Sequence, residues 1–205
     1  MSRLRYLAFA TALVVSGRAN AGDIRVLVRD GGGKPVANAV VWVEVPGTTA
    51  AKPGHYRINQ RDIAFDPGVM VIPIGSTVDF ANLDPVRHHV YSFSPAKKFE
   101  LKLFGKGESR SVRFDRPGVV AVGCNIHDSM QAFIHIVATP FAARTGRDGR
   151  AVIRSVPGGP RSLTIWHALQ RAPASRVTRP VNASANLALT VPIRLRRPAP
   201  MSHDY

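Results

Sequence analysis

The chain has 205 residues and carries 28 Lys and Arg against 13 Asp and Glu, so its formal charge at pH 7 is +15. It has a single cysteine, Cys124, which excludes an intramolecular disulfide. The excess of positive charge favours an anionic partner or surface. Nucleic acid is disfavoured as that partner, because the amino-terminal segment indicates export from the cytoplasm.

The first 21 residues have the three parts of an export signal. Arg3 and Arg5 precede an apolar run over residues 6–15, and small residues at 19–21 form a cleavage site after Ala21. The apolar run is too short to span a bilayer, which disfavours the alternative of an uncleaved anchor. We therefore expect a signal peptide over 1–21 and a periplasmic or secreted protein of charge +12 without a transmembrane anchor.

Short apolar runs with two-residue alternation follow the signal, and Gly, Pro, Asp or Ser separate them. Such runs predict strands of an all-β sandwich or barrel. Pro192 would break a hydrogen-bonded ladder, so the last strand is expected at a sheet edge. The tail over 196–205 is expected to be disordered. The expected strands cover residues 24–28, 41–45, 63–65, 69–72, 77–82, 89–93, 99–103, 111–114, 119–122, 133–138, 151–156, 163–167 and 187–195.

The loop between the expected strands at 119–122 and 133–138 carries three side chains that bind soft metals. Cys124, His127 and Met130 follow one another at three-residue spacing, and His88 and His89 lie upstream on another strand. One thiolate, two imidazoles and a weak thioether are the ligands of blue-copper electron-transfer sites. Adjacent strand residues face opposite sides, so only one of the two upstream histidines can reach the metal.

Other interpretations of these residues are weaker. Structural zinc takes four strong ligands, and only three are present here. A cysteine nucleophile would need a general base and oxyanion donors, to which nothing in the sequence points. The chain contains no His-x-His pair, so the additional copper centres of an oxidase are unsupported, and we expect neither an enzyme nor a catalytic residue. His135 is expected to be packed on its strand, and the remaining histidines at 55, 167 and 203 have no metal-binding partners.

Residues 57–139 resemble the cupredoxins, of the plastocyanin and amicyanin kind. The resemblance implies a Greek-key β-sandwich with one type 1 copper, bound by His88 rather than His89, by Cys124 and His127, and axially by Met130. His127 would be the electron exit. Residues 87–95 and 123–128 are also similar to bacterial cupredoxin-like "methylamine utilization proteins", although Ser129 stands where that group commonly has an aromatic residue. The resemblance is carried by residues 65–67, 69–75, 78–80, 82, 84, 88, 114, 117–118 and the Cys124-x-x-His127-x-x-Met130 loop.

The flanks resemble a different module, the carboxypeptidase regulatory-like sandwich of transthyretin type. Residues 33–41 look like its opening strands, and residues 145–150 and 156–167 look like its continuation. We expect one small sandwich, built from residues 22–54 and 140–195, into which a cupredoxin domain of residues 55–139 is inserted. Two separate appendages are the alternative. Insertion predicts contacts between Val26 or Val41 and Leu163 or Ile165.

The predicted function is that of an exported carrier of single electrons. Residues 140–205 hold eleven arginines against two acidic residues, which suits docking to an acidic redox protein such as a c-type cytochrome, or to another anionic surface. A plain arginine bias is the alternative explanation of this charge. The rival functions are a copper-binding or delivery module without redox turnover, and a structural sandwich that has lost its metal.

Overall fold

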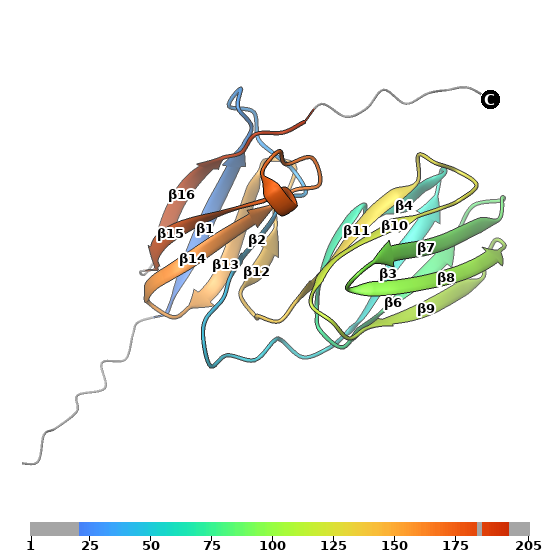
Figure 1. Cartoon of the computed structure of the whole chain (residues 1–205), viewed down its shortest axis with the longest axis horizontal. Helices are drawn as coiled ribbons and strands as arrows, with labels where there is room; N and C mark the ends of the chain where they lie inside the picture. Colours follow the sequence, from blue (N-terminus) through green and yellow to red (C-terminus); the bar gives the residue numbers. More distant parts are fainter. Residues whose placement is uncertain (1–20, 184–185, 197–205) are drawn as a thin grey trace, which may run out of the picture.

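The computed structural model describes residues 21–183 and 186–196, so the expected signal segment 1–20 and most of the expected tail (197–205) lie outside the described residues. The described chain is almost entirely β-structure, which confirms the expected all-β fold (Figure 1). The 3-10 turn η1 (Pro173–Ser175) is its one helical piece, and no helix of the described residues is long and apolar enough to cross a membrane. The strands are β1 (Gly22–Arg29), β2 (Val40–Val43), β3 (His55–Arg61), β4 (Ala64–Asp66), β5 (Val69–Pro73), β6 (Ser76–Asn82), β7 (His88–Ser94), β8 (Lys97–Phe104), β9 (Ser109–Phe114), β10 (Gly118–Gly123), β11 (Gln131–Val137), β12 (Ala142–Arg144), β13 (Arg150–Val156), β14 (Gly159–Trp166), β15 (Arg176–Ala183) and β16 (Leu187–Pro192).

Strands from the two ends of the chain share two sheets. One sheet has the order β13-β1-β16 and the other has the order β12-β2-β14-β15. Between β2 and β14, Ile165 lies opposite Val41 and Leu163 lies opposite Val43. The four side chains are fully buried in one apolar core, because alternate residues of each strand point to the same face. β16 pairs with β1 alone among the described strands, so Pro192 lies on an edge strand, where a missing N–H is tolerated.

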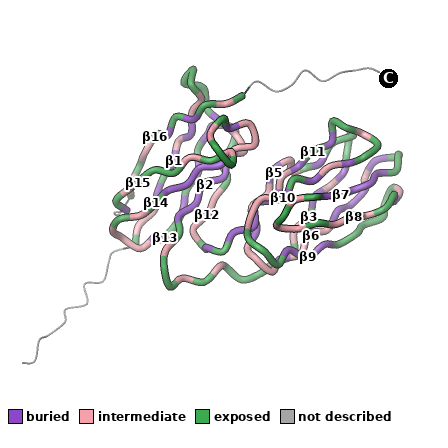
Figure 2. Tube along the Cα trace, in the orientation of Figure 1, coloured by how far each residue is buried: buried purple, intermediate pink, exposed green. Residues whose placement is uncertain are grey.

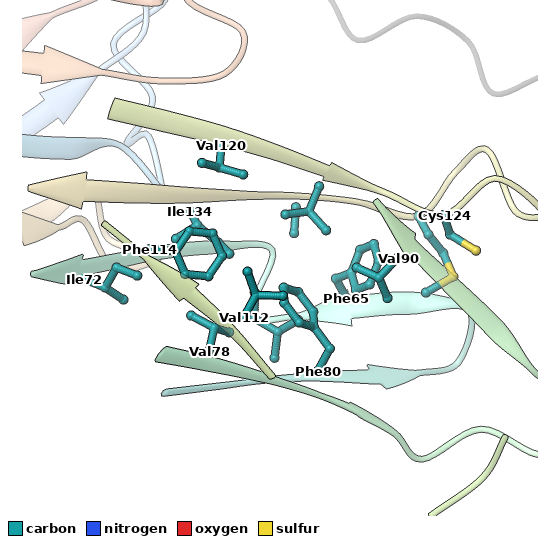
Figure 3. Packing of buried hydrophobic residues seen from close by; sticks show 14 of the residues in the cluster. Phe65, Ile72, Val78, Phe80, Val90, Val112, Phe114, Val120, Cys124 and Ile134 are labelled. Atoms are coloured by element: carbon teal, nitrogen blue, oxygen red, sulfur yellow. The ribbon is translucent and has the colours of Figure 1, made fainter. Parts of the chain in front are cut away.

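Residues 55–137 form the second pair of sheets. Their orders are β5-β11-β10-β7-β8 and β4-β3-β6-β9. The inner faces enclose a separate core of valine, isoleucine and phenylalanine side chains. Figure 3 shows Cys124 at one end of this core, with Ile72 and Phe114 toward the other. The cysteine thus belongs to the end of an apolar interior rather than to an exposed loop.

The two crossings of the chain between the sandwiches are bonded to each other. The Thr139 hydroxyl donates to the Val43 carbonyl at 2.8 Å, and the Val43 N–H donates to the Phe141 carbonyl at 2.9 Å. The outgoing chain at the end of β2 therefore runs beside the incoming chain before β12. Figure 1 shows the two sandwiches lying side by side at these crossings.

A small aromatic cluster closes the contact between the sandwiches. Trp42 and Trp166 extend from the outer face of β2 and β14 and pack with Val69 of the other sandwich. The His135 ring lies between them, with its centroid 4.9 Å from that of Trp42 and 5.4 Å from that of Trp166. Burial, with a smaller contribution from the Arg176 charge, lowers the pKa of His135 to about 4. His135 is thus packed, as expected, and it stays neutral at pH 7.

Three strands were absent from the sequence prediction, namely β3, β12 and β15. Most of their residues are charged, polar or partly exposed, so none shows a clear apolar alternation. β15 pairs with β14 over its whole length and is held by backbone hydrogen bonds more than by burial. Figure 2 shows the contrast, with the buried residues of β2 and β7 in purple and much of β15 in green.

The buried neutral state of His135 should make folding stability depend on pH. An unfolded histidine takes up a proton near pH 6.5, whereas the folded one does so near pH 4. The unfolded chain therefore binds more protons between these values, and stability should fall as pH drops from 6.5 to 4, by at most about 3 kcal/mol. The free energy of unfolding, measured with urea between pH 4 and 6.5, should depend less on pH in His135→Gln than in the wild type. In His55→Gln, which replaces an exposed histidine, it should depend on pH as in the wild type. An equal pH dependence of the unfolding free energy in all three proteins would contradict a buried, neutral His135.

Candidate metal centre

The structure separates the two adjacent histidines at the start of β7. His88 is fully buried and its ring lies 5.0 Å, centroid to centroid, from that of His127. His89 turns to the outer face, where its Nε2 lies 2.9 Å from the Glu100 carboxylate and its ring packs on Tyr91. A register irregularity at His89 separates the two directions. His88 therefore joins the cluster with Cys124 and His127, and His89 does not.

A buried carboxylate sets the orientation of His88. Nε2 of His88 donates to Oδ2 of Asp84 at 2.7 Å, which leaves the Nδ1 lone pair available. This Nδ1 is buried and has no hydrogen-bond partner among the described residues. A buried ring nitrogen without a partner is costly unless something binds it. Carboxylate, imidazole and metal in series are a common arrangement, in which the carboxylate fixes the tautomer and raises the basicity of the ring.

Asp84 is itself fixed by the tight turn between β3 and β4. Its two carboxylate oxygens accept the N–H groups of Asp62 at 2.6 Å and Ile63 at 3.1 Å. Both residues have positive φ, 54° and 53°, a strained conformation for a β-branched residue such as Ile63. Burial alone would raise the pKa of Asp84, but the hydrogen bonds from His88, Ile63 and Asp62 outweigh it and lower that pKa. Asp84 is thus an ionised partner for His88.

The Asn82 side chain also fixes the loop before His88 through hydrogen bonds. The Asn82 amide donates to the carbonyls of Val86 at 2.8 Å and Phe104 at 2.9 Å, and its oxygen accepts the Asp84 N–H at 2.8 Å. Asn82 is fully buried, so each of these bonds replaces a lost contact with water. The carboxylate and the histidine are therefore held in place without help from a ligand.

The other two cluster members come from the loop between β10 and β11. Sγ of Cys124 lies 3.8 Å from Nδ1 of His127, and the donor atoms of His88, Cys124 and His127 all lie within 4.8 Å of one another. Sulfur and nitrogen bonded to one ion at about 2.3 and 2.1 Å, and about 120° apart, would be about 3.8 Å from each other. The three side chains are therefore close enough together to hold a single ion.

Met130 ends the same loop. Its N–H donates to the His127 carbonyl at 3.0 Å, which closes a tight turn directly before β11. The side chain is 1% exposed and belongs to the same core cluster as Cys124. A buried thioether in the same cluster as the cysteine adds a weak soft donor to the thiol and two imidazoles, a combination that suits copper because such ligands bind both of its oxidation states. The residues present therefore fit a copper ion.

One residue of this site was missed at the sequence level as a functional group. Asp84 follows the expected strand at 77–82, and the cupredoxin resemblance includes this position without predicting its hydrogen bond to His88. Its position four residues before the histidine was the only local signal. The anchoring turn at Asp62 and Ile63 adjoins β3, a strand that the apolar pattern did not reveal.

Comparison with known proteins gives partial structural similarities. No family model matches the chain, and no curated protein matches it. Among solved structures, it is similar to a Cu-containing nitrite reductase (NirK) from Thermus scotoductus SA-01, at 26% identity and a TM-score of 0.40, over 46% of this chain and 25% of that one. The aligned part thus spans only a quarter of the reductase.

Two smaller proteins align over most of their own length. A purple cupredoxin from Nitrosopumilus maritimus shows 21% identity and a TM-score of 0.37, covering 40% of this chain and 99% of that one. An amicyanin from Paracoccus versutus shows 15% identity and a TM-score of 0.37, covering 46% and 86%. Since these TM-scores are low, we base the function on the residues and geometry of the site.

The Asp84 carboxylate should strengthen metal binding through His88. Replacing it with alanine removes the hydrogen bond that orients the His88 ring, so affinity for copper should fall about 10- to 100-fold, with Asp84→Asn intermediate. Competition with a chromogenic Cu(I) chelator measures the change. Glu100→Gln is the matched control, because Glu100 holds the neighbouring His89. If Asp84→Ala binds copper as tightly as Glu100→Gln does, the carboxylate has no such role.

Proposed function

We propose that this protein is an exported, non-enzymatic carrier of single electrons with one type 1 copper, bound by His88, Cys124, His127 and axially by Met130. The observation that carries the proposal is the cluster of donor atoms from His88, Cys124 and His127, which all lie within 4.8 Å of one another, together with a buried His88 Nδ1 that has no hydrogen-bond partner among the described residues. The copper would supply the change between Cu(II) and Cu(I), and its partners would supply and remove the electron.

The chain's own residues would keep the change between Cu(II) and Cu(I) fast. Electron transfer is rapid when the ligands move little between the two oxidation states, which requires a rigid, preformed site. Asp84 and Asn82 hold the His88 side, and the turn from His127 to Met130 holds the other. Cys124 is 2% exposed, so water is kept from the thiolate. The protein would therefore act by positioning and by exclusion of solvent.

His127 is the ligand that a redox partner can reach. It is partly exposed, whereas His88, Cys124 and Met130 are buried. Three exposed apolar side chains lie in loops at this end of the sandwich, namely Ile63, Val86 and Ile126, each 43–46% exposed. Exposed apolar side chains in the loops at the end of the sandwich that carries a partly exposed ligand suit a brief encounter with a protein such as a c-type cytochrome. The arginines of the last third of the chain would add attraction to an acidic partner.

A copper-delivery module is the second candidate. Delivery requires an open site from which the ion can be exchanged, whereas three of the four proposed ligands here are buried. The preformed hydrogen bonds around His88 also favour retention of the ion. Electron transfer with a resident copper is therefore the better-supported function.

Several finer assignments complete the proposal. The chain would be exported through cleavage after Ala21 to the periplasm or outside the cell. Residues 55–139 would be a cupredoxin domain of the methylamine-utilization type, inserted into a carboxypeptidase regulatory-like sandwich of residues 22–54 and 140–195. The pairing of β2 with β14 and of β1 with β13 supports this division, because it joins segments on either side of residues 55–139.

The spectrum of the copper-loaded protein tests the proposed thiolate ligand. Cu(II) should give an intense blue charge-transfer band and a narrow copper hyperfine splitting in electron paramagnetic resonance, and Cys124→Ser should abolish both. A blue band that survives in Cys124→Ser, or a tetragonal signal in the wild type, would disprove the electron-carrier function and favour delivery or a structural role.

The reduction potential tests Met130 separately. A thioether donates electron density and favours Cu(II), so Met130→Leu should keep copper and raise the potential by about 60 mV or more, a tenfold change in the Cu(I)/Cu(II) equilibrium. Met70→Leu is the matched control, because Met70 lies on β5 outside the ligand loop. Equal potentials for the two variants, measured by protein-film voltammetry, would exclude Met130 as a ligand.

A further inference from the structure

A cleft of about 1260 Å³ opens between the two sandwiches, away from the metal site. It is lined by the first residues of β10 and the last residues of β11, whereas the metal ligands lie beyond the opposite ends of these strands. One wall is Pro117, Gly118 and Val119, and the other comes from β14, β15 and η1. The volume is ample for a small organic molecule.

Three rings line the cleft. Trp42, Trp166 and His135 all contribute to it, and they are the same rings that pack together where the sandwiches meet. They are 8%, 4% and 5% exposed, so they form a fixed aromatic base. Nδ1 of His135 is buried without a hydrogen-bond partner among the described residues. Only the small exposed part of each ring is open to the cleft, and a ligand ring would make its aromatic contacts there.

The wall from the flanking sandwich carries two cationic side chains. Arg161 and Arg176 both line the cleft, and neither forms an ion pair within the described part of the chain. Nη1 and Nη2 of Arg161 donate to the carbonyls of Pro160 and Gly158, each at 2.7 Å, so its buried Nε is the one donor of this guanidinium without an acceptor. Glu44 is the one acidic residue of the lining, so the cleft keeps an excess of positive charge. Guanidinium groups bind carboxylates with short, charge-assisted hydrogen bonds.

We propose that the cleft is a binding site for a small aromatic carboxylate. The ring of the ligand lies on the base formed by Trp42, Trp166 and His135, and its carboxylate pairs with Arg161 and Arg176. The site needs residues of both sandwiches, so neither sandwich alone provides it. It is independent of copper, because no proposed metal ligand lines the cleft.

Tryptophan fluorescence reports this site directly, because Trp42 and Trp166 are the only tryptophans of the chain. 4-Nitrobenzoate, whose nitro group quenches indole, should quench the full-length protein with a saturable curve. Its neutral analogue 4-nitrobenzamide should bind at least tenfold more weakly. Arg161→Gln and Arg176→Gln should each weaken binding of 4-nitrobenzoate about tenfold, the usual effect of losing one charge-assisted hydrogen bond.

The controls distinguish a built site from general adsorption. Arg57→Gln removes an exposed arginine of β3, which does not line the cleft, and should bind 4-nitrobenzoate as the wild type does. Copper-free and copper-loaded protein should give the same dissociation constant. Linear quenching without saturation, equal affinity for the acid and the amide, or full affinity in both Arg161→Gln and Arg176→Gln would overturn the proposal. None of these outcomes bears on the copper assignment.

Discussion

The hydrogen bond between the Asp84 carboxylate and Nε2 of His88 is the interaction on which the geometry of the metal site depends. Nε2 of the ring is bonded to the ionised carboxylate, so Nδ1 keeps a free lone pair. The ring belongs to the same cluster as Cys124 and His127. A buried carboxylate would be unfavourable by itself, and the N–H groups of Asp62 and Ile63 compensate for its desolvation. The strained turn of those two residues is thereby explained, since it aims two donors at one carboxylate.

This arrangement divides the ligands into a fixed side and an accessible side. His88 begins β7 of the sheet β5-β11-β10-β7-β8 and is held by Asp84, which the turn between β3 and β4 anchors, and Cys124 is held at the end of an apolar core. His127 lies in a short loop and is partly exposed. If copper binds as we propose, a site that is rigid within and open at a single imidazole would suit electron transfer better than release of the ion. This division of the proposed ligands is why we propose electron transfer rather than copper delivery.

The sequence predicted those features that depend on local spacing. The Cys124-x-x-His127 spacing places Sγ and Nδ1 of these residues 3.8 Å apart, and apolar alternation revealed strands such as β1, β10 and β13. The apolar pattern of the sequence did not reveal β3, β12 and β15, because these strands are held by backbone pairing and bury little apolar surface. The role of Asp84 was equally hidden, because it depends on the approach of a turn 22 residues away in the chain. Long-range contacts of polar groups leave no periodic pattern in a sequence.

Strand β11 explains how the flanking sandwich can support the candidate metal site without contributing a residue to it. The strand begins directly after Met130, and its inner face, with Ala132 and Ile134, forms the core beneath the ligand loop. Its outer face, with Phe133 and His135, packs on the tryptophans of the flanking sandwich. Strand residues alternate strictly, so one segment is clamped from both sides. Movement of β11 would disturb both packed faces at once, and the end of the ligand loop is therefore anchored against two cores instead of one.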